Sequence, residues 1–492
     1  MSRSSSSNSL SSDDEYYGDN GEQFRGSIIQ NRYTLIEKIG YGSYSSVWLV
    51  FNIQDNNYYA MKIQNSEDYE EGVDEMKILQ KLKEFNNNNI IKLVESFEII
   101  KKDIEKVKIK KGKKSYLKKK VYLNKHVCMV MPLMAGSIYS LIREGKYSNG
   151  LPLHIVKKCL RSLLESVLLV HKKIKYCHTD LKPENMLITG ISLKVKEIID
   201  EYNSFKLVEK AEEKIRETLE NKKWNLSTPN NKKKVRKLKT NVYRKIHNEI
   251  LDNMICLENI ESDDESEYES SEESDKKENI QIKLGKEDRI ASDSSELNSN
   301  EKEYKEDDLS DTDSEQVNSY EVIDDSTLES GDIILTDFGS AMKISELDDE
   351  LQTRYYRAPE IILNTNITEK IDIWSIGCIV FELFTGKILF DPDKDQKFSR
   401  DFHHLYLIEE LFGKIPLYLI KNSPRKKEFF NKKNKLRCED IKPIDLNEEI
   451  SRKNEDIVDF IKKCLVIDPK NRPDIDTLLK HKIFQNNEIN II

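Results

Sequence analysis

Residues 178–185 read HTDLKPEN, and this stretch carries most of the information about fold and chemistry. It places a carboxylate that can accept a proton (Asp180), a cation (Lys182) and a potential metal-binding amide (Asn185) within eight residues. Further motifs follow in order: DIILTDFG (332–339), APE (358–360), DIW (372–374) and DPKNR (468–472). Chance does not explain such an ordered series, so these residues indicate one catalytic unit.

Two patterns upstream of this stretch fit phosphate binding. Residues 40–47 read GYGSYSSV, and glycine lets the backbone approach phosphate oxygens closely, although an ordinary hairpin turn explains the pattern equally well. The next strand carries Lys62, and a helix thirteen residues on carries Glu75. A lysine held by a glutamate can orient the α- and β-phosphates of a nucleotide, whereas an isolated pair is more often a surface salt bridge.

Composition limits the class of protein. Hydrophobic residues make up 37% of the 492 residues and charged residues 34%, where globular chains have roughly 45–50% and about 25%. No stretch approaches the ~18 apolar residues of a transmembrane helix, and residues 1–17 lack the apolar core of a secretory signal. The seven cysteines are scattered without a CxxC pair, which argues against a disulfide framework or a zinc site. We therefore expect a soluble intracellular protein, in the cytoplasm, the nucleus or both, without membrane contact.

Charge is unevenly distributed and predicts an internal spacer. The net charge is −9, but residues 261–330 hold 26 acidic and 7 basic residues, and residues 222–245 hold ten basic residues and no acidic one. Blocks of like charge that are poor in aliphatic residues usually remain disordered. We predict a charged low-complexity spacer over 191–330, which is either a solvated internal tail or a regulatory segment. Its early part, residues 192–219, is helix-like and could pack against the fold. In the second case KKKVRKLK (232–239) would be an import signal or a patch for acidic partners.

The rest of the chain forms two patterned blocks. The first, residues 31–190, begins with short strand-like runs and one helix and continues as helices, including 152–173 with apolar residues at 3–4 spacing. The second, residues 331–484, opens with a strand and is then mostly helical. Twelve lysines within 101–125, between two strand-like runs, predict a basic loop insertion. The predicted division is a disordered Ser-rich tail (1–30), a β-rich lobe (31–134), a first helical part (135–190), the spacer (191–330) and a second helical part (331–485).

Together these motifs resemble those of the eukaryotic protein kinases, over residues 32–484 apart from the spacer. The resemblance implies an α+β, two-lobed protein kinase fold, with a small β-rich N-lobe and a larger helical C-lobe, split by a long disordered spacer. It also implies ATP and Mg²⁺ as cofactors and protein serine or threonine as the phosphoryl acceptor. Glu360 with Arg472, and Asp372 toward the catalytic loop, would stabilise the fold.

The resemblance also implies roles for individual residues. Asp180 would accept or orient the substrate hydroxyl proton, and Lys182 would neutralise charge on the γ-phosphate. Lys62, fixed by Glu75, would orient the α- and β-phosphates. The metal ligands would be Asn185 and Asp337. The ATP-binding residues would be Ile39, Gly40, Gly42, Val47, Ala60, Lys62, Met131 (as gatekeeper), Met134 and Leu187.

Further motifs narrow the resemblance to the CMGC group and, within it, to the SR-protein kinases. QTRYYRAPE (352–360) and the insert at 390–415 are similar to the CMGC pattern. Ser45 in place of a third glycine, Thr179 in place of arginine and the long spacer after ENM are similar to the SR-protein kinases. DFG and APE depart from the DLG and altered APE typical of that family, and His403 stands where an acidic docking residue is expected.

The same resemblance implies Arg-Ser-rich protein substrates and constitutive activity, because Thr179 carries no charge that waits for an activation-loop phosphate. The candidate substrate-binding residues are Glu184, Glu382 and Glu410, with Asp401 and Glu409 as a more distant docking surface. We expect a monomer that binds no nucleic acid directly. Two alternatives remain: a CMGC kinase without Arg-Ser preference, and a pseudokinase scaffold whose acidic spacer binds basic partners.

Overall fold

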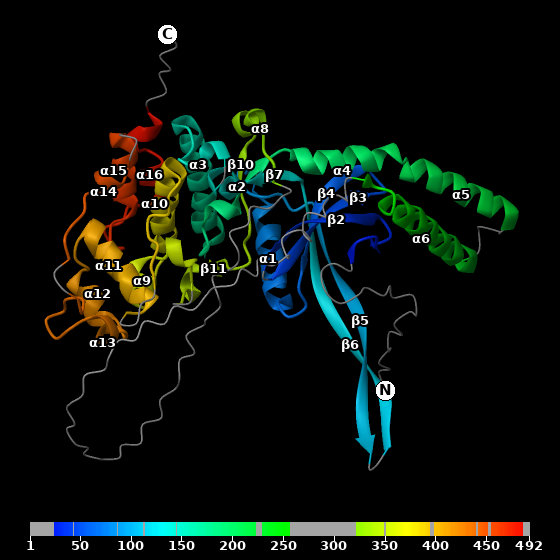
Figure 1. The fold of residues 1–492 in the computed structure, drawn as a ribbon, viewed down its shortest axis with the longest axis horizontal. Coiled ribbons are helices and arrows are strands. Elements are labelled where there is room, and N and C mark those ends of the chain that lie inside the picture. The colour runs from blue at the N-terminus through cyan, green and yellow to red at the C-terminus, as the bar shows by residue number, and fades with distance from the viewer. Residues whose placement is uncertain are drawn as a thin grey trace, which may run out of the picture. The chain divides into compact units, whose positions relative to one another are not determined.

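The computed structural model describes residues 24–485, apart from 43, 86, 112–113, 144, 223–228, 256–320, 349–350, 394–397, 439–440 and 451–453. The N-lobe is built on a six-stranded antiparallel sheet of order β1-β2-β3-β4-β6-β5 (Figure 1). Its strands are β1 (Ile28–Ile29), β2 (Tyr33–Gly42), β3 (Ser45–Asn52), β4 (Asn57–Gln64), β5 (Glu95–Lys111) and β6 (Lys114–Met131). Leu35, Trp48, Val50 and Met61 are buried together on this sheet, which gives the N-lobe a core of its own.

One helix of the N-lobe faces the site. In α1 (Tyr69–Leu82), the buried residues Gly72, Glu75, Ile78 and Leu82 recur at the three- to four-residue spacing of a helix face. Glu75 is the charged residue among them. A buried carboxylate is stable only when it is paired or hydrogen-bonded, so this position demands a partner.

The basic segment 101–125, for which the sequence predicts a loop, is instead the outer part of a long antiparallel hairpin formed by β5 and β6. In its register Ile104 lies opposite Val121 and Ile109 lies opposite Tyr116. β-Branched and aromatic residues favour strands, and they recur here among the lysines. The lysine count concealed this pattern, so the loop prediction was wrong.

The C-lobe is mainly helical. Its longer helices are α2 (Ile138–Arg143), α3 (Leu153–Leu169), α10 (Lys370–Thr385), α11 (Arg400–Phe412), α12 (Leu417–Asn422) and α15 (Glu455–Cys464). Its short helices are α9 (Pro359–Ile362), α13 (Lys426–Phe429), α14 (Leu446–Glu449) and α16 (Ile475–Leu478). Helix α10 is buried on all sides from Ile371 onward, which explains why its sequence is apolar around the whole helix. Within the part of the chain that the structure describes, no helix combines the length and apolarity needed to cross a membrane.

Two small sheets frame the catalytic loop. One has the order β10-β9-β7 and the other pairs β11 with β8. Their strands are β7 (Met134–Ser137), β8 (Tyr176–Cys177), β9 (Met186–Thr189), β10 (Ile333–Leu335) and β11 (Met342–Lys343). Met186 lies opposite Leu335, and the Thr336 amide donates to the Asn185 carbonyl at 3.0 Å. Residues on either side of the insert therefore become neighbours at the site.

Much of the predicted spacer is helical. The structure places α4 (Leu193–Ser204), α5 (Leu207–Lys222) and α6 (Pro229–Leu251) in it, and α5 and α6 lie side by side (Figure 1). Each helix has a buried stripe at helical spacing, for example Ile198 and Tyr202 in α4, and Tyr243 and His247 in α6. The helix-like pattern predicted for residues 192–219 is confirmed by α4 and α5. Abundant basic residues concealed the stripe in α6, so the prediction of disorder was wrong for 229–251. Most of the acidic run, 256–320, lies outside the described residues.

The catalytic domain already includes Glu321, ten positions before the predicted residue 331. The Glu321 carboxylate accepts hydrogen bonds from the Ser137 amide (2.9 Å) and hydroxyl (2.7 Å), and α8 (Asp325–Ser330) follows. Gly136 has a φ of +151°, and a Cβ there would lie 2.9 Å from Cβ of Glu321, so this close approach requires glycine. At the other end, Phe24 and β1 are buried in the N-lobe, while residues 1–23 of the predicted tail lie outside the described residues.

Candidate active site

Three charged side chains from three elements meet in the cleft. Lys62 Nζ on β4 lies 2.9 and 2.8 Å from the two carboxylate oxygens of Glu75 on α1, and 3.0 Å from Oδ1 of Asp337 after β10. Lys62 lowers the pKa of Asp337 to about 2, while burial raises the pKa of Glu75. Burial alone would lower the pKa of Lys62, but Asp337 and Glu75 outweigh it and raise that pKa. The lysine thus stays a cation between two acidic groups.

Asp372 on α10 anchors the catalytic loop, residues 178–185. Its carboxylate accepts from the amides of His178 (2.8 Å) and Thr179 (3.0 Å) and lies 2.7 Å from Nε2 of His171. Thr179 has a φ of +68° and Asp337 one of +61°, a left-handed conformation that is uncommon outside glycine. Backbone strain of this kind collects at functional sites, where surrounding contacts hold it in place. Asp372 supplies those contacts for Thr179, as the sequence predicts.

Asp180 lies next to a cation and a hydroxyl. Lys182 Nζ is 2.9 Å from its Oδ2, and the Thr353 hydroxyl donates to its Oδ1 at 2.6 Å. The Asn185 amide nitrogen donates to the Asp180 carbonyl at 2.8 Å. Burial alone would raise the pKa of Asp180, but Lys182 and Thr353 outweigh it and lower that pKa. Asp180 is therefore ionised at neutral pH, as a proton acceptor must be.

Thr353 is a functional candidate whose role at the site the sequence reasoning missed. The activation segment, residues 337–360, holds three serine or threonine hydroxyls, and the sequence gives Thr353 no role beyond being one of them. In the structure its hydroxyl also lies 3.4 Å from Lys182 Nζ. It thus contacts both members of the Asp180–Lys182 pair. Its position in QTRYYRAPE, a stretch already used to narrow the resemblance, is the signal that pointed to it.

Strand register assembles the predicted nucleotide pocket. Val47 on β3 lies opposite Gly40 on β2 and Lys62 on β4, and Ala60 lies opposite Met131 on β6. Ala60 and Met131 are buried, whereas the side chains expected to cover the base are half-buried: Ile39, Val47, Met134 and Leu187. Gly42 is exposed beside the turn, and residue 43 lies outside the described residues. The predicted ATP-binding residues on β2, β3, β4 and β6 thus lie on neighbouring strands of the N-lobe sheet, whereas Met134 and Leu187 lie on β7 and β9 of a separate sheet.

The predicted substrate carboxylates differ from one another. Glu382 does not lie at an exposed lip, because it is 0% exposed. Its carboxylate accepts from Arg143 Nη2 at 2.6 Å and from the Tyr356 hydroxyl at 2.7 Å. Burial raises the pKa of Glu382 to about 7, and the charge of nearby Glu184 adds to that rise. Glu184 has a buried Oε2 without a hydrogen-bond partner among the described residues, and burial raises its pKa.

The acidic residues of the predicted docking surface already accept hydrogen bonds from other side chains of this chain. Asp401 accepts from Arg354 at 2.8 Å and from Arg425 at 2.7 Å, so it links the activation segment to the C-lobe and is not a free docking residue. Glu410 is half-buried and accepts from the Tyr406 hydroxyl at 3.2 Å. The structure does not bring Glu410 together with the Asp180 group.

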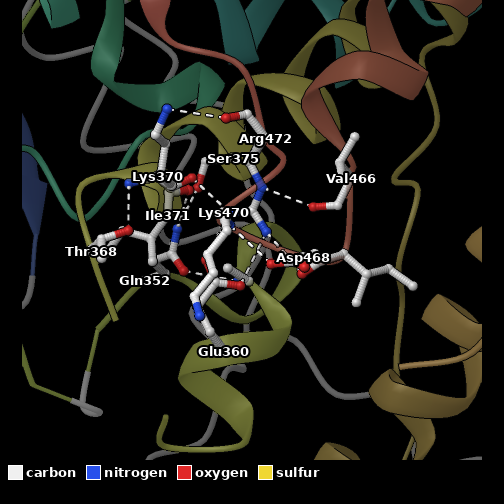
Figure 2. Close-up of polar contacts among 12 residues, drawn as sticks. Gln352, Glu360, Thr368, Lys370, Ile371, Ser375, Val466, Asp468, Lys470 and Arg472 are labelled. Carbon is white, nitrogen blue, oxygen red and sulfur yellow. Dashed lines mark hydrogen bonds and ion pairs between the residues drawn. The ribbon is translucent and has the colours of Figure 1, made fainter. Parts of the chain in front are cut away.

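A second polar cluster supports the segment that leads into the site (Figure 2). Arg472 and Glu360 are both 0% exposed in their side chains and pair at 2.7 and 3.1 Å, as the sequence predicts. Arg472 also donates to the carbonyls of Lys370 and Val466. The Gln352 side chain bonds to the Ser375 hydroxyl and the Ile371 carbonyl beside them. This cluster fixes the activation segment to α10.

His171, Cys177 and Asp372 lie close enough together to suggest a metal site. The carboxylate of Asp372 is already used by two backbone amides and His171. Burial raises the pKa of the Cys177 thiol well above its ordinary value, which opposes the thiolate that a metal requires. The cluster is therefore an anchor for the catalytic loop.

Known proteins match the chain along most of its length. The family model described as the protein kinase domain matches residues 33–216 and 324–484. A protein named as a serine/threonine-protein kinase of Acanthamoeba polyphaga mimivirus is 32% identical, over 93% of this chain and 88% of the relative. Protein kinase dsk1 of Schizosaccharomyces pombe is 26% identical (92% and 79%), and SRSF protein kinase 3 of Mus musculus is 26% identical (84% and 78%).

A solved structure supports the fold itself. The crystal structure of a kinase domain superposes with a TM-score of 0.55 and 21% identity, covering 95% of this chain and 98% of that chain. The prediction of a β-sheet N-lobe and a helical C-lobe split by an insert is confirmed. The chain therefore belongs to the protein kinase family, as a serine/threonine kinase of the CMGC type similar to the SR-protein kinases.

Proposed function

We propose that this kinase transfers the γ-phosphoryl group of ATP to protein serine or threonine hydroxyls, with Asp180, Lys182, Lys62 and Glu75 in the catalytic roles. The carrying observation is that the Lys62–Glu75–Asp337 and Asp180–Lys182–Thr353 groups are complete in one conformation. Phosphoryl transfer needs alignment and charge neutralisation more than covalent help. A peptide array with purified protein and γ-labelled ATP tests this directly, and absence of label on every serine and threonine peptide would contradict it.

We propose ATP as the phosphoryl donor and Mg²⁺ as the metal ion, with Asn185 and Asp337 as its ligands. The donor set fits, because a carboxylate and an amide oxygen are hard ligands of the kind that Mg²⁺ prefers. Asp337 is ionised, and its side chain is 44% exposed. The side-chain nitrogen of Asn185 donates to the Asp180 carbonyl, which leaves the side-chain oxygen of Asn185 available to a metal ion. When bound, Mg²⁺ neutralises phosphate charge. Lys62 holds Asp337 in place.

We propose that the enzyme is constitutively active. An arginine before the catalytic aspartate would be a buried cation that waits for a phosphate, but Thr179 is neutral. Its hydroxyl already donates to the Ser340 carbonyl at 2.7 Å, so the side chain needs no phosphate as a partner. We expect phosphatase treatment to change kcat by less than about twofold. A large loss of activity in the treated sample, compared with a mock-treated one, would contradict this proposal.

We propose a preference for Arg-Ser-rich substrates, with Glu184 as the main contact. Arg143 is the only cation within hydrogen-bond reach of the buried Glu382 among the described residues, and Glu184 keeps an unpaired buried oxygen. An unpaired buried carboxylate oxygen is unfavourable, and a guanidinium is the donor that pairs best with it. A substrate arginine would relieve that state.

Arg-Ser recognition predicts a specific kinetic pattern. We expect Glu184→Ala to raise KM for an Arg-Ser peptide by about tenfold or more, since charge-assisted hydrogen bonds contribute roughly 1.5–3 kcal/mol. Glu217→Ala, which removes an exposed carboxylate on α5 that belongs to no predicted site, is the matched control and should leave KM unchanged. Equal KM values for Arg-Ser and Arg-free peptides on the unmodified enzyme would contradict the preference.

One observation favours the alternative, a CMGC-type kinase directed to Ser-Pro. Nε and Nη2 of Arg357 donate to the Gln352 carbonyl at 3.1 and 2.8 Å, directly before Thr353. Because this carbonyl already accepts two hydrogen bonds, it is a poor acceptor for the backbone N–H of a substrate residue next to the target serine. Proline has no backbone N–H and needs no such acceptor. A Ser-Pro peptide without arginine that reacts as well as an Arg-Ser repeat would decide for this alternative.

We also propose an intracellular monomer that acts on proteins and binds no nucleic acid or membrane. The six cysteines in the described residues are free thiols, and five are buried, which fits a reducing compartment. Sedimentation of the purified chain at micromolar concentration tests the oligomeric state, and a dimer there would contradict the proposal.

A further inference from the structure

Two helices of the insert are joined to the N-lobe by a buried polar network. Tyr202 on α4 is 2% exposed, and its hydroxyl lies 2.8 Å from Nδ1 of His247 on α6 and 3.3 Å from the Thr34 hydroxyl. His247 is 0% exposed, and its Nε2 lies 3.0 Å from the Leu35 carbonyl. A carbonyl only accepts, so Nε2 carries the proton and Nδ1 accepts from Tyr202. Each side chain therefore has one defined role.

This network contacts the strand that leads into the ATP site. Thr34 and Leu35 belong to β2, and the same strand continues to Gly40 and Gly42. At about 3.4 Å per residue, Gly40 lies roughly 17 Å along the strand from Leu35. The β2–β3 register is irregular between these two positions, so strand pairing alone leaves the path of the turn less fixed.

The other end of α4 is attached to the strand that follows the catalytic loop. The Ser192 hydroxyl, three residues after the end of β9, caps the helix by accepting from the Val195 amide. The helix has 12 residues, about 18 Å at 1.5 Å per residue. At its far end the Tyr58 hydroxyl of β4 donates to the Asn203 side chain at 2.7 Å. Helix α4 thus connects a strand of the C-lobe to strands of the N-lobe.

Apolar contacts make this connection stiff. The Tyr202 ring lies 6.0 Å from the Phe51 ring and 6.3 Å from the Tyr58 ring, measured between centroids. Aromatic pairs at this separation add to the stabilisation from burial. On α6, the Thr240 hydroxyl also donates to the Asn31 side chain at 2.8 Å. Both helices therefore hold the start of β2.

We propose that α4 and α6 form a brace that keeps β2 and the glycine-containing turn in position to bind ATP, with Tyr202 and His247 as positioning residues. Neither residue contacts the nucleotide site, so each acts through β2. If the turn is in position only a fraction of the time, the apparent affinity for ATP falls by that fraction. Saturating ATP restores the bound conformation, so kcat is nearly retained.

The test compares KM for ATP with kcat in variants of the full chain. We expect His247→Leu to raise KM for ATP about five- to tenfold while kcat changes less than twofold. His247→Gln should stay near the unmodified value, because its amide still donates to the Leu35 carbonyl. Ser423→Ala is the matched control, since it removes a buried hydroxyl bond to the Leu363 carbonyl (2.6 Å) and should leave KM for ATP unchanged.

Tyr202→Phe keeps the proposal testable if His247→Leu does not fold. It retains the ring and removes only the hydroxyl, so we expect a smaller rise in KM for ATP in the same direction. The brace is rejected if His247→Leu is unfolded while folded Tyr202→Phe and His247→Gln both have the KM for ATP of the unmodified enzyme. It is also rejected if Ser423→Ala raises KM for ATP as much as the brace variants do. A fall in kcat without a change in KM would also reject it.

Discussion

Replacing Asp180 with asparagine should lower kcat by about 10²–10⁴-fold while leaving the protein folded. Asparagine has nearly the same shape, so it can still accept the Thr353 bond, but it cannot take a proton from a substrate hydroxyl. The measurement is steady-state transfer of labelled phosphate to a serine peptide, with folding checked by circular dichroism. Turnover close to the unmodified value would remove Asp180 from the chemistry.

Two further variants make this result interpretable. Asp476→Asn removes a carboxylate that is 56% exposed, and it should leave kcat unchanged. Lys62→Met should also lower kcat strongly, because the clamp on the α- and β-phosphates is lost. That variant leaves Glu75 and Asp337 without their cation, so it also destabilises the cleft. Asp180→Asn is therefore the cleaner test of the chemical step.

Replacing Glu360 with alanine should lower the free energy of unfolding by about 3–5 kcal/mol. The Arg472 guanidinium is 0% exposed, and without Glu360 it becomes a buried charge with only carbonyl partners (Figure 2). The expected readout is a lower midpoint in guanidinium chloride with an unchanged slope. KM for ATP of the folded fraction should not change, because the pair lies outside the cleft.

A double variant separates a lost ion pair from lost packing. Glu360→Leu combined with Arg472→Met replaces the pair by apolar side chains, and such replacements of buried pairs are often neutral or stabilising. We expect the double variant to recover most of the midpoint lost by Glu360→Ala. A single variant within 1 kcal/mol of the unmodified protein would show that the pair contributes little.

The sequence predicted the fold well where a motif identifies a loop or strand. It predicted the fold less well where only the composition of a segment was available. HTDLKPEN and TDFG located the catalytic loop and its partner strand, because their chemistry requires one arrangement of side chains. Residues 101–111, 114–125 and 229–251 were misassigned because abundant lysine and arginine outweighed a sparser apolar pattern. In α6, a buried stripe that includes Tyr243 and His247 is enough to attach one face of a strongly charged helix.

The candidate site shows the same division. Spacing along a strand and a helix left the Lys62–Glu75 pair open to a surface salt bridge, and the resemblance to protein kinases assigned its role. The burial of Glu382 did not follow, because it depends on Arg143, which is 239 positions away and belongs to another helix. The contact of Thr353 with Asp180 joins residues 173 positions apart. Such contacts are set by the tertiary path of the chain.

The pairing of β9 with β10 has a consequence for biosynthesis. Met186 lies opposite Leu335, so the ribosome must add about 150 residues between the two strands. At a translation rate of roughly 5–20 residues per second, β10 is synthesised about 7–30 seconds after β9. During that time one edge of β9 is open on the nascent chain, and an open edge can pair with another chain. A nascent chain that ends before residue 337 also lacks one of the two proposed metal ligands, so catalytic competence arises only late in translation.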